Sequence, residues 1–287
     1  MAKRNLPFED NPRSIKYYVK RLLMAERSFF EGKRVIDFPA GNGVTSRLLQ
    51  EVKAIPLPMD LFPEYFETEG LTCERANIKE GLPVADASAD VLICQEGIEH
   101  FSDQLEALRE FNRVLVPGGK MLITTPNYSN LVARLSYGLA ESERHTSFMP
   151  PNELDSIWMS KQELTAEIYF GHIFLIGIQK LRVLAKLAGF QIETWYPTKP
   201  KRSAKILYLF GYPWIYLFNR MLYRKNMRKN QRFGEAMKRS IYEEQFRLST
   251  DRKLLVGSHL MVMFIKEKEL HEVGPALSSK QDTFGVT

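Results

Sequence analysis

Two carboxylates and an imidazole lie close together near the middle of the chain: Glu96, Glu99 and His100. Residues three and four positions apart share one face of a helix, so these three side chains are expected to converge. They could bind a divalent cation, Mg²⁺ or Mn²⁺, which would lower the pKa of a hydroxyl group beside it. His100 could instead act as a general base without a metal. Either arrangement would activate a hydroxyl group for reaction.

Glycines and small residues follow an apolar run earlier in the chain, between Asp37 and Gly43. Gly41 and Gly43 would let a strand reverse into a helix while main-chain groups remain free to face a ligand. Asp60 closes the next apolar run, about 20 residues beyond this turn, where a carboxylate can accept both hydroxyls of a ribose. A further run ends at Asn77, whose amide could contact an adenine edge. This spacing favours a nucleotide-containing cofactor.

Strands that end at a common edge would have to position these residues. The apolar runs predict strands, and residues 101–116 have the spacing of an amphipathic helix. The predicted strands span residues 33–38, 54–59, 71–76, 91–94, 120–127, 190–196 and 257–265. Pro56 and Pro58 fall in the second of them, and because proline removes a ladder hydrogen bond, we expect that strand to be short or distorted. The alternation of strands and helices predicts an α/β fold.

As a set, these motifs resemble a class I S-adenosylmethionine-dependent methyltransferase, especially the branch of ubiquinone-biosynthesis O-methyltransferases. The resemblance covers residues 32–190 and resumes at residues 257–265. It implies a doubly wound, Rossmann-like, seven-stranded methyltransferase sheet with helical insertions, and S-adenosyl-L-methionine as the cofactor. The cofactor-binding residues that it implies are Asp37, Pro39, Ala40, Gly41 and Gly43 at the methionine end, Asp60 and Leu61 at the ribose, Asn77 and Ile78 at the adenine, and Gln95.

The same resemblance bears on the candidate catalytic residues. Glu96, Glu99 and His100 match an E-x-x-E-H set that binds a metal in ubiquinone-pathway enzymes and in small-RNA 3′-end 2′-O-methyltransferases. His172 precedes a predicted helix where the family often has a histidine, and it could reach the site, although it could equally be a structural residue. The implied activity is methyl transfer to an oxygen of a small or lipid-linked acceptor. The alternatives are an RNA 2′-O-methyltransferase and a non-catalytic cofactor-binding protein.

Length and composition favour one domain. A chain of 287 residues with 44% hydrophobic residues can bury a sizeable core, and we expect residues 1–268 to form one methyltransferase domain. Residues 141–171 make a long connection after the fifth strand and are expected to form a lid-like insertion. Residues 269–287 contain few large side chains and are expected to be a disordered tail.

The positive charge is concentrated in a second insertion, residues 199–253. It holds 15 Lys+Arg and 4 Asp+Glu, a net charge of +11, whereas the whole chain has +6. Within it, the uncharged aromatic run 206–219 is too short to span a bilayer, and cations follow it as far as residue 229. An apolar and aromatic surface followed by cations is what contact with a membrane surface requires. A packed helical cap or a dimer contact remains an alternative, and nucleic-acid binding is not favoured because the cations do not interleave with the aromatics.

The N-terminal residues and the two cysteines bear on the cellular compartment of the protein. Residues 1–10 lack the apolar run of a secretory signal. Cys73 and Cys94 are expected to be reduced core thiols, as in intracellular proteins. We therefore expect a cytoplasmic protein. Contact of residues 206–229 with a membrane surface, one of the two interpretations above, would make it peripheral at the inner face of the membrane.

Overall fold

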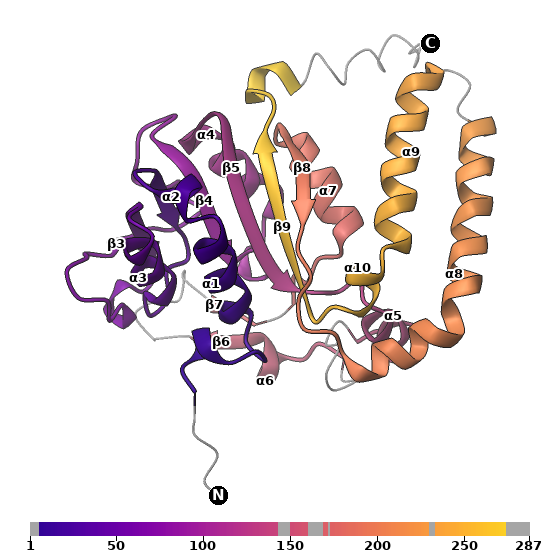
Figure 1. The fold of residues 1–287 in the computed structure, drawn as a ribbon, viewed down its shortest axis with the longest axis horizontal. Helices are drawn as coiled ribbons and strands as arrows, with labels where there is room; N and C mark the ends of the chain where they lie inside the picture. Colours follow the sequence, from indigo (N-terminus) through magenta and orange to yellow (C-terminus); the bar gives the residue numbers. More distant parts are fainter. Residues whose placement is uncertain (1–5, 143–149, 160–168, 172, 230–232, 274–287) are drawn as a thin grey trace, which may run out of the picture.

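A computed structural model describes residues 6–142, 150–159, 169–171, 173–229 and 233–273. Its centre is a seven-stranded sheet of order β3-β2-β1-β4-β5-β9-β8 (Figure 1). The strands are β1 Arg34–Asp37, β2 Ile55–Asp60, β3 Glu74–Arg75, β4 Ala89–Gln95, β5 Leu115–Pro126, β8 Phe190–Trp195 and β9 His259–Lys266. Strand β9 runs antiparallel to both of its neighbours, and the other pairings are parallel. The predicted doubly wound α/β sheet is confirmed.

Helices cover both faces of this sheet, because side chains alternate between the faces along each strand. Val35 and Ile93 face α1 (Ile15–Ala25), α2 (Arg27–Phe30) and α3 (Val44–Glu51). The neighbouring Ile36 and Leu92 face the opposite layer, formed by α4 (Gln104–Val114) and α7 (Ile178–Leu187). Ser14 caps α1 by accepting a hydrogen bond from the Lys16 N–H. The two cores hold the strands so that their carboxyl ends meet at one edge.

Strand β2 is regular over six residues despite Pro56 and Pro58, so the expectation of a short or distorted strand was wrong. The Ile55 N–H donates to Lys33 O on the β1 side, whereas Asp60 O accepts from the Ala76 N–H on the β3 side. By alternation, both prolines direct their nitrogens toward β3, which pairs with β2 only from Met59 onward. The missing N–H groups therefore lie where β2 has no partner strand.

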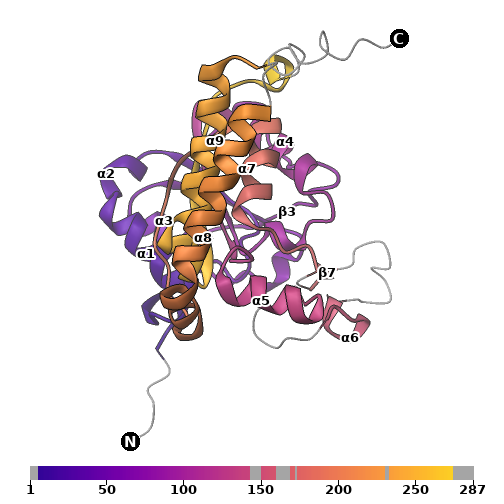
Figure 2. The same cartoon turned by 90° about the vertical axis from the view of Figure 1, so that its right-hand side faces the viewer.

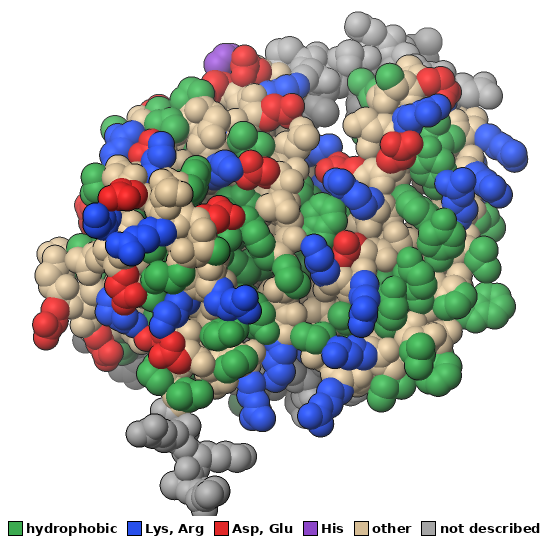
Figure 3. Space-filling model, in the orientation of Figure 1, with side chains coloured by type: hydrophobic (Ala, Val, Ile, Leu, Met, Phe, Trp, Pro, Cys, Tyr) green, Lys and Arg blue, Asp and Glu red, His purple; other side chains and the backbone are tan. Residues whose placement is uncertain are grey.

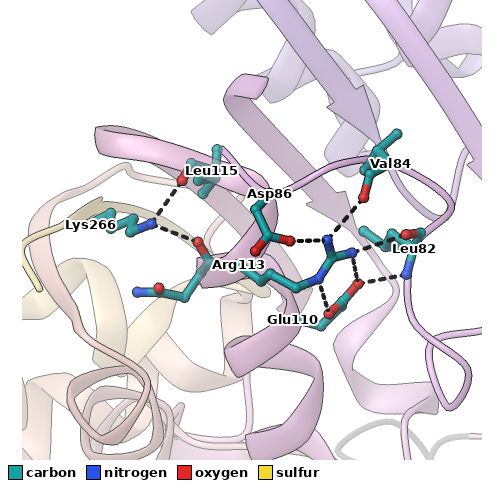
Figure 4. Close-up of polar contacts among 8 residues, drawn as sticks. Leu82, Val84, Asp86, Glu110, Arg113, Leu115 and Lys266 are labelled. Atoms are coloured by element: carbon teal, nitrogen blue, oxygen red, sulfur yellow. Dashed lines mark hydrogen bonds and ion pairs between the residues drawn. The ribbon is translucent and has the colours of Figure 1, made fainter. Parts of the chain in front are cut away.

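Polar contacts from the last strand lock α4 in place (Figure 4). The buried Lys266 Nζ donates to the carbonyls of Asn112 and Leu115 at the C-terminal end of α4, at 2.9 and 2.8 Å. Arg113 of the same helix pairs with Glu110 at 2.5 Å and donates to Leu82 O at 3.0 Å. These contacts fix the chain before β4 against α4.

The insertion after β5 and the start of the expected tail both contain regular structure outside the seven-stranded sheet. The predicted lid-like insertion contains α6 (Glu153–Ser156) and the antiparallel pair β6 (Ile157–Met159) and β7 (Tyr169–Phe170), after α5 (Leu131–Ala140); residues 143–149 and 160–168 lie outside the described residues. Within the expected tail, residues 270–273 form a helical turn in which Val273 is buried.

The basic insertion is a helical hairpin of α8 (Arg202–Lys229) and α9 (Glu235–Thr250), followed by α10 (Arg252–Val256). The aromatic run and the cations after it lie in the single 28-residue helix α8, which contains Pro213. Figures 1 and 2 show α8 as the outermost element, with α9 between it and the sheet. None of the helices in the described part of the chain is long and apolar enough to cross a membrane.

Candidate active site

A cavity of about 250 Å³ opens at the edge where the parallel strands end. Its wall comes from the ends of β1 and β2, the segment after β3, and the segment between β4 and α4. The lining residues are Phe38, Pro39, Asp60, Leu61, Asn77, Ile78, Lys79, Gly97, His100, Phe101, Ser102, Asp103, Glu106 and Ala107. The structure thus brings five of the predicted cofactor residues, Pro39, Asp60, Leu61, Asn77 and Ile78, together with His100.

Asp60 is held by the backbone around it. Its Oδ2 accepts from the Gly41 N–H and its Oδ1 accepts from the Phe62 N–H, both at 2.8 Å. A carboxylate has about four acceptor positions, so both oxygens retain capacity for a hydroxyl donor. The glycine turn therefore fixes the carboxylate while leaving it able to bind a diol.

The other predicted cofactor residues, Asp37, Ala40, Gly41, Gly43 and Gln95, do not line the cavity. Two of them hold the first turn of α3 against the strand ends. Ser46 Oγ donates to Asp37 Oδ2 at 2.5 Å, and Thr45 Oγ1 donates to Gln95 Oε1 at 2.7 Å. Gly43 begins this helix with φ of +85°, a left-handed conformation that glycine tolerates without strain.

Asp37 keeps one buried oxygen, Oδ1, without a hydrogen-bond partner among the described residues. Burial raises the pKa of Asp37 to about 7, although the hydrogen bond from Ser46 opposes the shift. A cationic ligand group beside Oδ1 would satisfy the oxygen and favour its charged form. The site thus fits the ammonium group at the methionine end of S-adenosylmethionine.

Lys16 of α1 also reaches the glycine turn, which the sequence did not indicate. Its Nζ donates to Asn42 Oδ1 at 2.8 Å. Burial lowers the pKa of Lys16, while the charges of Asp37 and Glu9 oppose this effect. A lysine one turn into an amphipathic helix has no local signature, since only the packing of α1 against α3 brings it here.

Pro39 and Gly97 form the contact between β1 and the segment after β4. A β-carbon on Gly97 would lie 2.3 Å from Pro39 Cδ and 3.0 Å from Cys94 Sγ, so no larger residue fits beside the proline ring. Both residues line the cavity. The proline ring in the glycine turn is therefore accommodated because the residue that packs against it, Gly97, has no side chain.

Asn77 and Ile78, which the resemblance assigns to the adenine, line the cavity after β3. The Asn77 amide is engaged in its own turn: Oδ1 accepts from the Lys79 N–H at 3.1 Å and Nδ2 donates to Glu80 at 3.2 Å. The side chain therefore shapes the turn that presents the backbone of this segment to the cavity.

The predicted helical face of Glu96, Glu99 and His100 is wrong. Glu96 lies before the helix in a left-handed conformation, with φ of 51°, and only Ile98–His100 form a single 3₁₀ turn. His100 lines the cavity, whereas Glu99 is completely buried. The described residues include no group of three or more His, Cys, Asp or Glu side chains arranged to hold a metal ion. The metal-binding arrangement predicted for these residues is therefore not supported.

Glu96 is turned toward β5 and β9 instead. Its Oε1 accepts from Thr124 Oγ1 at 3.0 Å, and its Oε2 lies 3.4 Å from His259 Nε2. Desolvation raises the pKa of Glu96, and the Thr124 hydroxyl opposes this shift. His259 was not predicted as a site residue. The available signal was its position as the first residue of an antiparallel strand, which places it opposite Pro126 at the carboxyl edge.

The two Glu99 carboxyl oxygens are buried and have no hydrogen-bond partner among the described residues. Burial, followed by the charge of Glu96, raises the pKa of Glu99 well above its ordinary value. Its surroundings therefore favour the neutral form of the Glu99 carboxyl group. His172 lies outside the described residues, so its predicted role stays a prediction.

Comparison with known proteins identifies the family. A family model described as a methyltransferase domain matches residues 9–194. A ubiquinone biosynthesis O-methyltransferase from Xanthomonas oryzae is 26% identical over 182 residues, which are 57% of this chain and 73% of that protein. One from Xanthomonas campestris is 25% identical over 169 residues, covering 53% of this chain and 70% of that protein. A solved methyltransferase from Archaeoglobus fulgidus superposes with a TM-score of 0.52 at 15% identity and covers 90% of this chain and 98% of its own.

These likenesses agree with the architecture, since the chain has the seven-stranded sheet and the edge cavity described above. The chain belongs to the methyltransferase domain family. It is an S-adenosylmethionine-dependent methyltransferase, as the sequence predicted. The alternative of a non-catalytic cofactor-binding protein is not supported.

Proposed function

We propose that this methyltransferase transfers the methyl group to an oxygen of a small or lipid-linked acceptor. The observation that carries the proposal is the single cavity that joins the predicted ribose and adenine residues to His100. Bound S-adenosylmethionine supplies an electrophilic methyl group on a sulfonium. The protein then has to hold the acceptor hydroxyl in line with that methyl group and accept its proton.

The cofactor would be held by groups that are already in place. The Asp60 carboxylate faces the cavity for the ribose hydroxyls, and the segment of Asn77 and Ile78 provides the wall for the adenine. Asp37 Oδ1 and the carbonyl of Pro39 are acceptors for the ammonium group. Asp60 would bind with little rearrangement, because it lines the cavity and backbone hydrogen bonds already fix its carboxylate, whereas the buried Oδ1 of Asp37 would first have to be uncovered.

We assign proton removal from the acceptor to His100. His100 lines the same cavity as the predicted cofactor residues, so an acceptor bound next to the transferred methyl group would contact it. Glu99 is adjacent to it in sequence, and burial raises the pKa of Glu99 well above its ordinary value; the pKa of Glu96, 3.4 Å from His259, is raised as well.

The charge of the cavity favours a small acceptor over RNA. Its wall contains one cation, Lys79, and three carboxylates, Asp60, Asp103 and Glu106. A phosphate backbone would require the opposite balance, because nucleic-acid binding depends on neutralisation by Lys and Arg. The names of the related ubiquinone biosynthesis O-methyltransferases support an O-methylated, lipid-linked acceptor. A cytoplasmic location, peripheral at the inner face of the membrane, is part of the proposal.

Transfer of labelled methyl from S-adenosylmethionine into a fractionated cell extract tests this function. Label should appear in the lipid or small-molecule fraction and should be stable to the base treatment that cleaves esters. The Asp60→Ala variant serves as the control, since it should lose labelling at limiting cofactor concentration. Label in RNA, or on a nitrogen of the product, would contradict the proposal.

A further inference from the structure

The outward face of α8 is apolar and uncovered. Large hydrophobic side chains recur every three or four residues, which places them on one side of the helix. Leu209, Phe210 and Trp214 are 72%, 73% and 75% exposed. The full stripe of exposed apolar residues is Ile206, Leu209, Phe210, Trp214, Leu217, Phe218 and Met221. Figure 3 shows these hydrophobic side chains gathered along the margin that α8 forms. We call this set the α8 stripe.

The opposite side of the same helix is packed. Ala204 is buried with Leu131, Leu255 and Val256 in a small core, and Tyr208 and Tyr212 pack against it. Tyr216 contacts Phe246 of α9 with ring centroids 5.4 Å apart. The packing alternative for this insertion thus accounts for one side of α8 and leaves the α8 stripe to contact something else.

Cations continue the stripe toward the C-terminal end of α8. Arg224, Lys225 and Arg228 are exposed and follow Leu217 and Met221 at the same helical spacing. The whole helix carries seven Lys and Arg residues and no Asp or Glu. One surface therefore changes along its length from apolar and aromatic to strongly cationic.

We propose that the α8 stripe docks on an anionic lipid bilayer surface. Aromatic and aliphatic side chains would enter the boundary between headgroups and acyl chains, and the cations beyond Met221 would meet anionic headgroups. Self-association through α8 fits less well, because this helix offers no carboxylate to pair with the cations of a second copy. The hairpin also lies beyond residues 9–194, so docking is a property additional to the methyltransferase domain.

Docking would orient the active site. Helix α8 starts beside α5 at the end of the molecule where the parallel strands finish (Figures 1 and 2). Leu135, Tyr137 and Leu139 of α5 are also exposed there. A bilayer against the apolar half of α8 and against α5 would thus lie near the carboxyl edge of the sheet, where a lipid-linked acceptor would be delivered.

Vesicle binding by the full chain tests this inference independently of methyl transfer. The protein should bind vesicles of phosphatidylglycerol and phosphatidylcholine, and binding should fall as salt rises to about 1 M, where the screening length is about 3 Å. The double variant Trp214→Ser, Phe218→Ser should bind at least about tenfold more weakly. Replacing Arg224, Lys225 and Arg228 with Gln should weaken binding about fivefold per cation.

Matched control variants distinguish binding through the α8 stripe and its cations from a general effect of surface hydrophobicity or net charge. Ile55→Ser removes an exposed apolar side chain at the far edge of the sheet. Replacing Arg27, Lys53 and Arg109 with Gln lowers the net charge by the same three units as the triple α8 variant, but at sites away from α8. Both controls should bind like the unmodified protein. Brominated acyl chains should quench tryptophan fluorescence, and Trp214→Phe, which preserves the apolar face, should remove most of that quenching.

Three results would overturn the inference. The first is absence of vesicle binding at low salt, and the second is equal loss of binding in the α8 variants and the controls. The third is a dimer in analytical ultracentrifugation that dissociates in the Trp214→Ser, Phe218→Ser variant, because a second copy would then cover the stripe. A failure of the proposed methyl transfer would leave each of these readouts unchanged.

Discussion

The two halves of the carboxyl edge hold their carboxyl groups in opposite ways. In the cofactor half, Asp60 accepts two backbone N–H groups and Asp37 accepts the Ser46 hydroxyl. In the half formed by β4, β5 and β9, Glu99 has no partner among the described residues, and the pKa of Glu96 is raised. The first half is built to bind fixed groups of a ligand. The second raises the pKa of both of its carboxyl groups, a kind of shift that is common at sites of proton transfer.

The largest difference between the halves should appear in turnover. His100→Ala should lower the rate of methyl transfer by about 10²–10⁴-fold while cofactor affinity changes little, because His100 acts on the acceptor. Single-turnover kinetics and calorimetry measure the two quantities. Ser102→Ala, which truncates another residue of the same cavity wall, is the control and should retain most activity.

A chelator distinguishes proton transfer by His100 from metal assistance. If His100 acts as the base, turnover should survive chelation; Glu96 is turned toward Thr124 and His259, and Glu99 is buried while His100 lines the cavity. Loss of activity on chelation, with recovery on adding Mg²⁺ or Mn²⁺, would contradict the assignment of His100. Full activity of His100→Ala would contradict it as well and would leave alignment of the substrates as the main source of catalysis.

Asp60→Ala should have the next largest effect, and this effect should be on cofactor affinity and not on the rate of methyl transfer. Loss of a charge-assisted hydrogen bond to the ribose should weaken cofactor affinity by about 1.5–3 kcal/mol. Calorimetry on the folded variant measures it, with Glu106→Gln as a control that alters another carboxylate of the cavity wall. Unchanged affinity in folded Asp60→Ala would remove Asp60 from the cofactor site.

Glu99→Gln should change how stability depends on pH. The raised pKa means that the native state binds more protons than the unfolded chain above the ordinary value of 4.5, so the free energy of unfolding falls as pH rises beyond that value. One such group contributes at most about 1.4 kcal/mol per pH unit. Glu99→Gln should flatten this slope, and denaturant unfolding at several pH values measures it. The exposed Glu74→Gln is the control, and an unchanged slope in Glu99→Gln would show that Glu99 is ionised in the native state.

The smallest effect is expected for Asp37, at the border between the halves. With a pKa of about 7 in the free protein, Asp37 must lose its proton to pair with the cofactor's ammonium group. Cofactor affinity should therefore rise about fivefold between pH 6 and pH 7. Asp37→Asn should remove this dependence. An affinity that is flat over this range in the unmodified protein would place the ammonium elsewhere.

The sequence was a good guide to elements and to the cofactor half. Apolar runs followed by Gly41, Asp60 and Asn77 predicted strand ends, and strand ends of a parallel sheet necessarily meet at one edge. The effect of Pro56 and Pro58 was misjudged because it depends on which side of β2 each missing N–H faces. That direction follows from the pairing of β2 with its neighbours, which local sequence does not specify.

The half of the carboxyl edge formed by β4, β5 and β9 was harder to predict, because its geometry depends on distant parts of the chain. Glu96 takes a left-handed conformation and contacts Thr124 and His259, which are 28 and 163 residues away. The i, i+3, i+4 spacing assumes a continuous helix, and this segment forms only one 3₁₀ turn. The sequence of α8 likewise does not show which of its sides is exposed, because that depends on the contacts of α8 with α5, α9 and α10.

The position of β9 also has a consequence for synthesis of the protein. This strand is the last among the described residues, yet it lies between β5 and β8, and its Lys266 holds the end of α4. A nascent chain that has already exposed α8 and α9 therefore still lacks the strand that completes its sheet. If α8 meets lipid as proposed, the growing polypeptide could reach the membrane before its catalytic domain has finished folding.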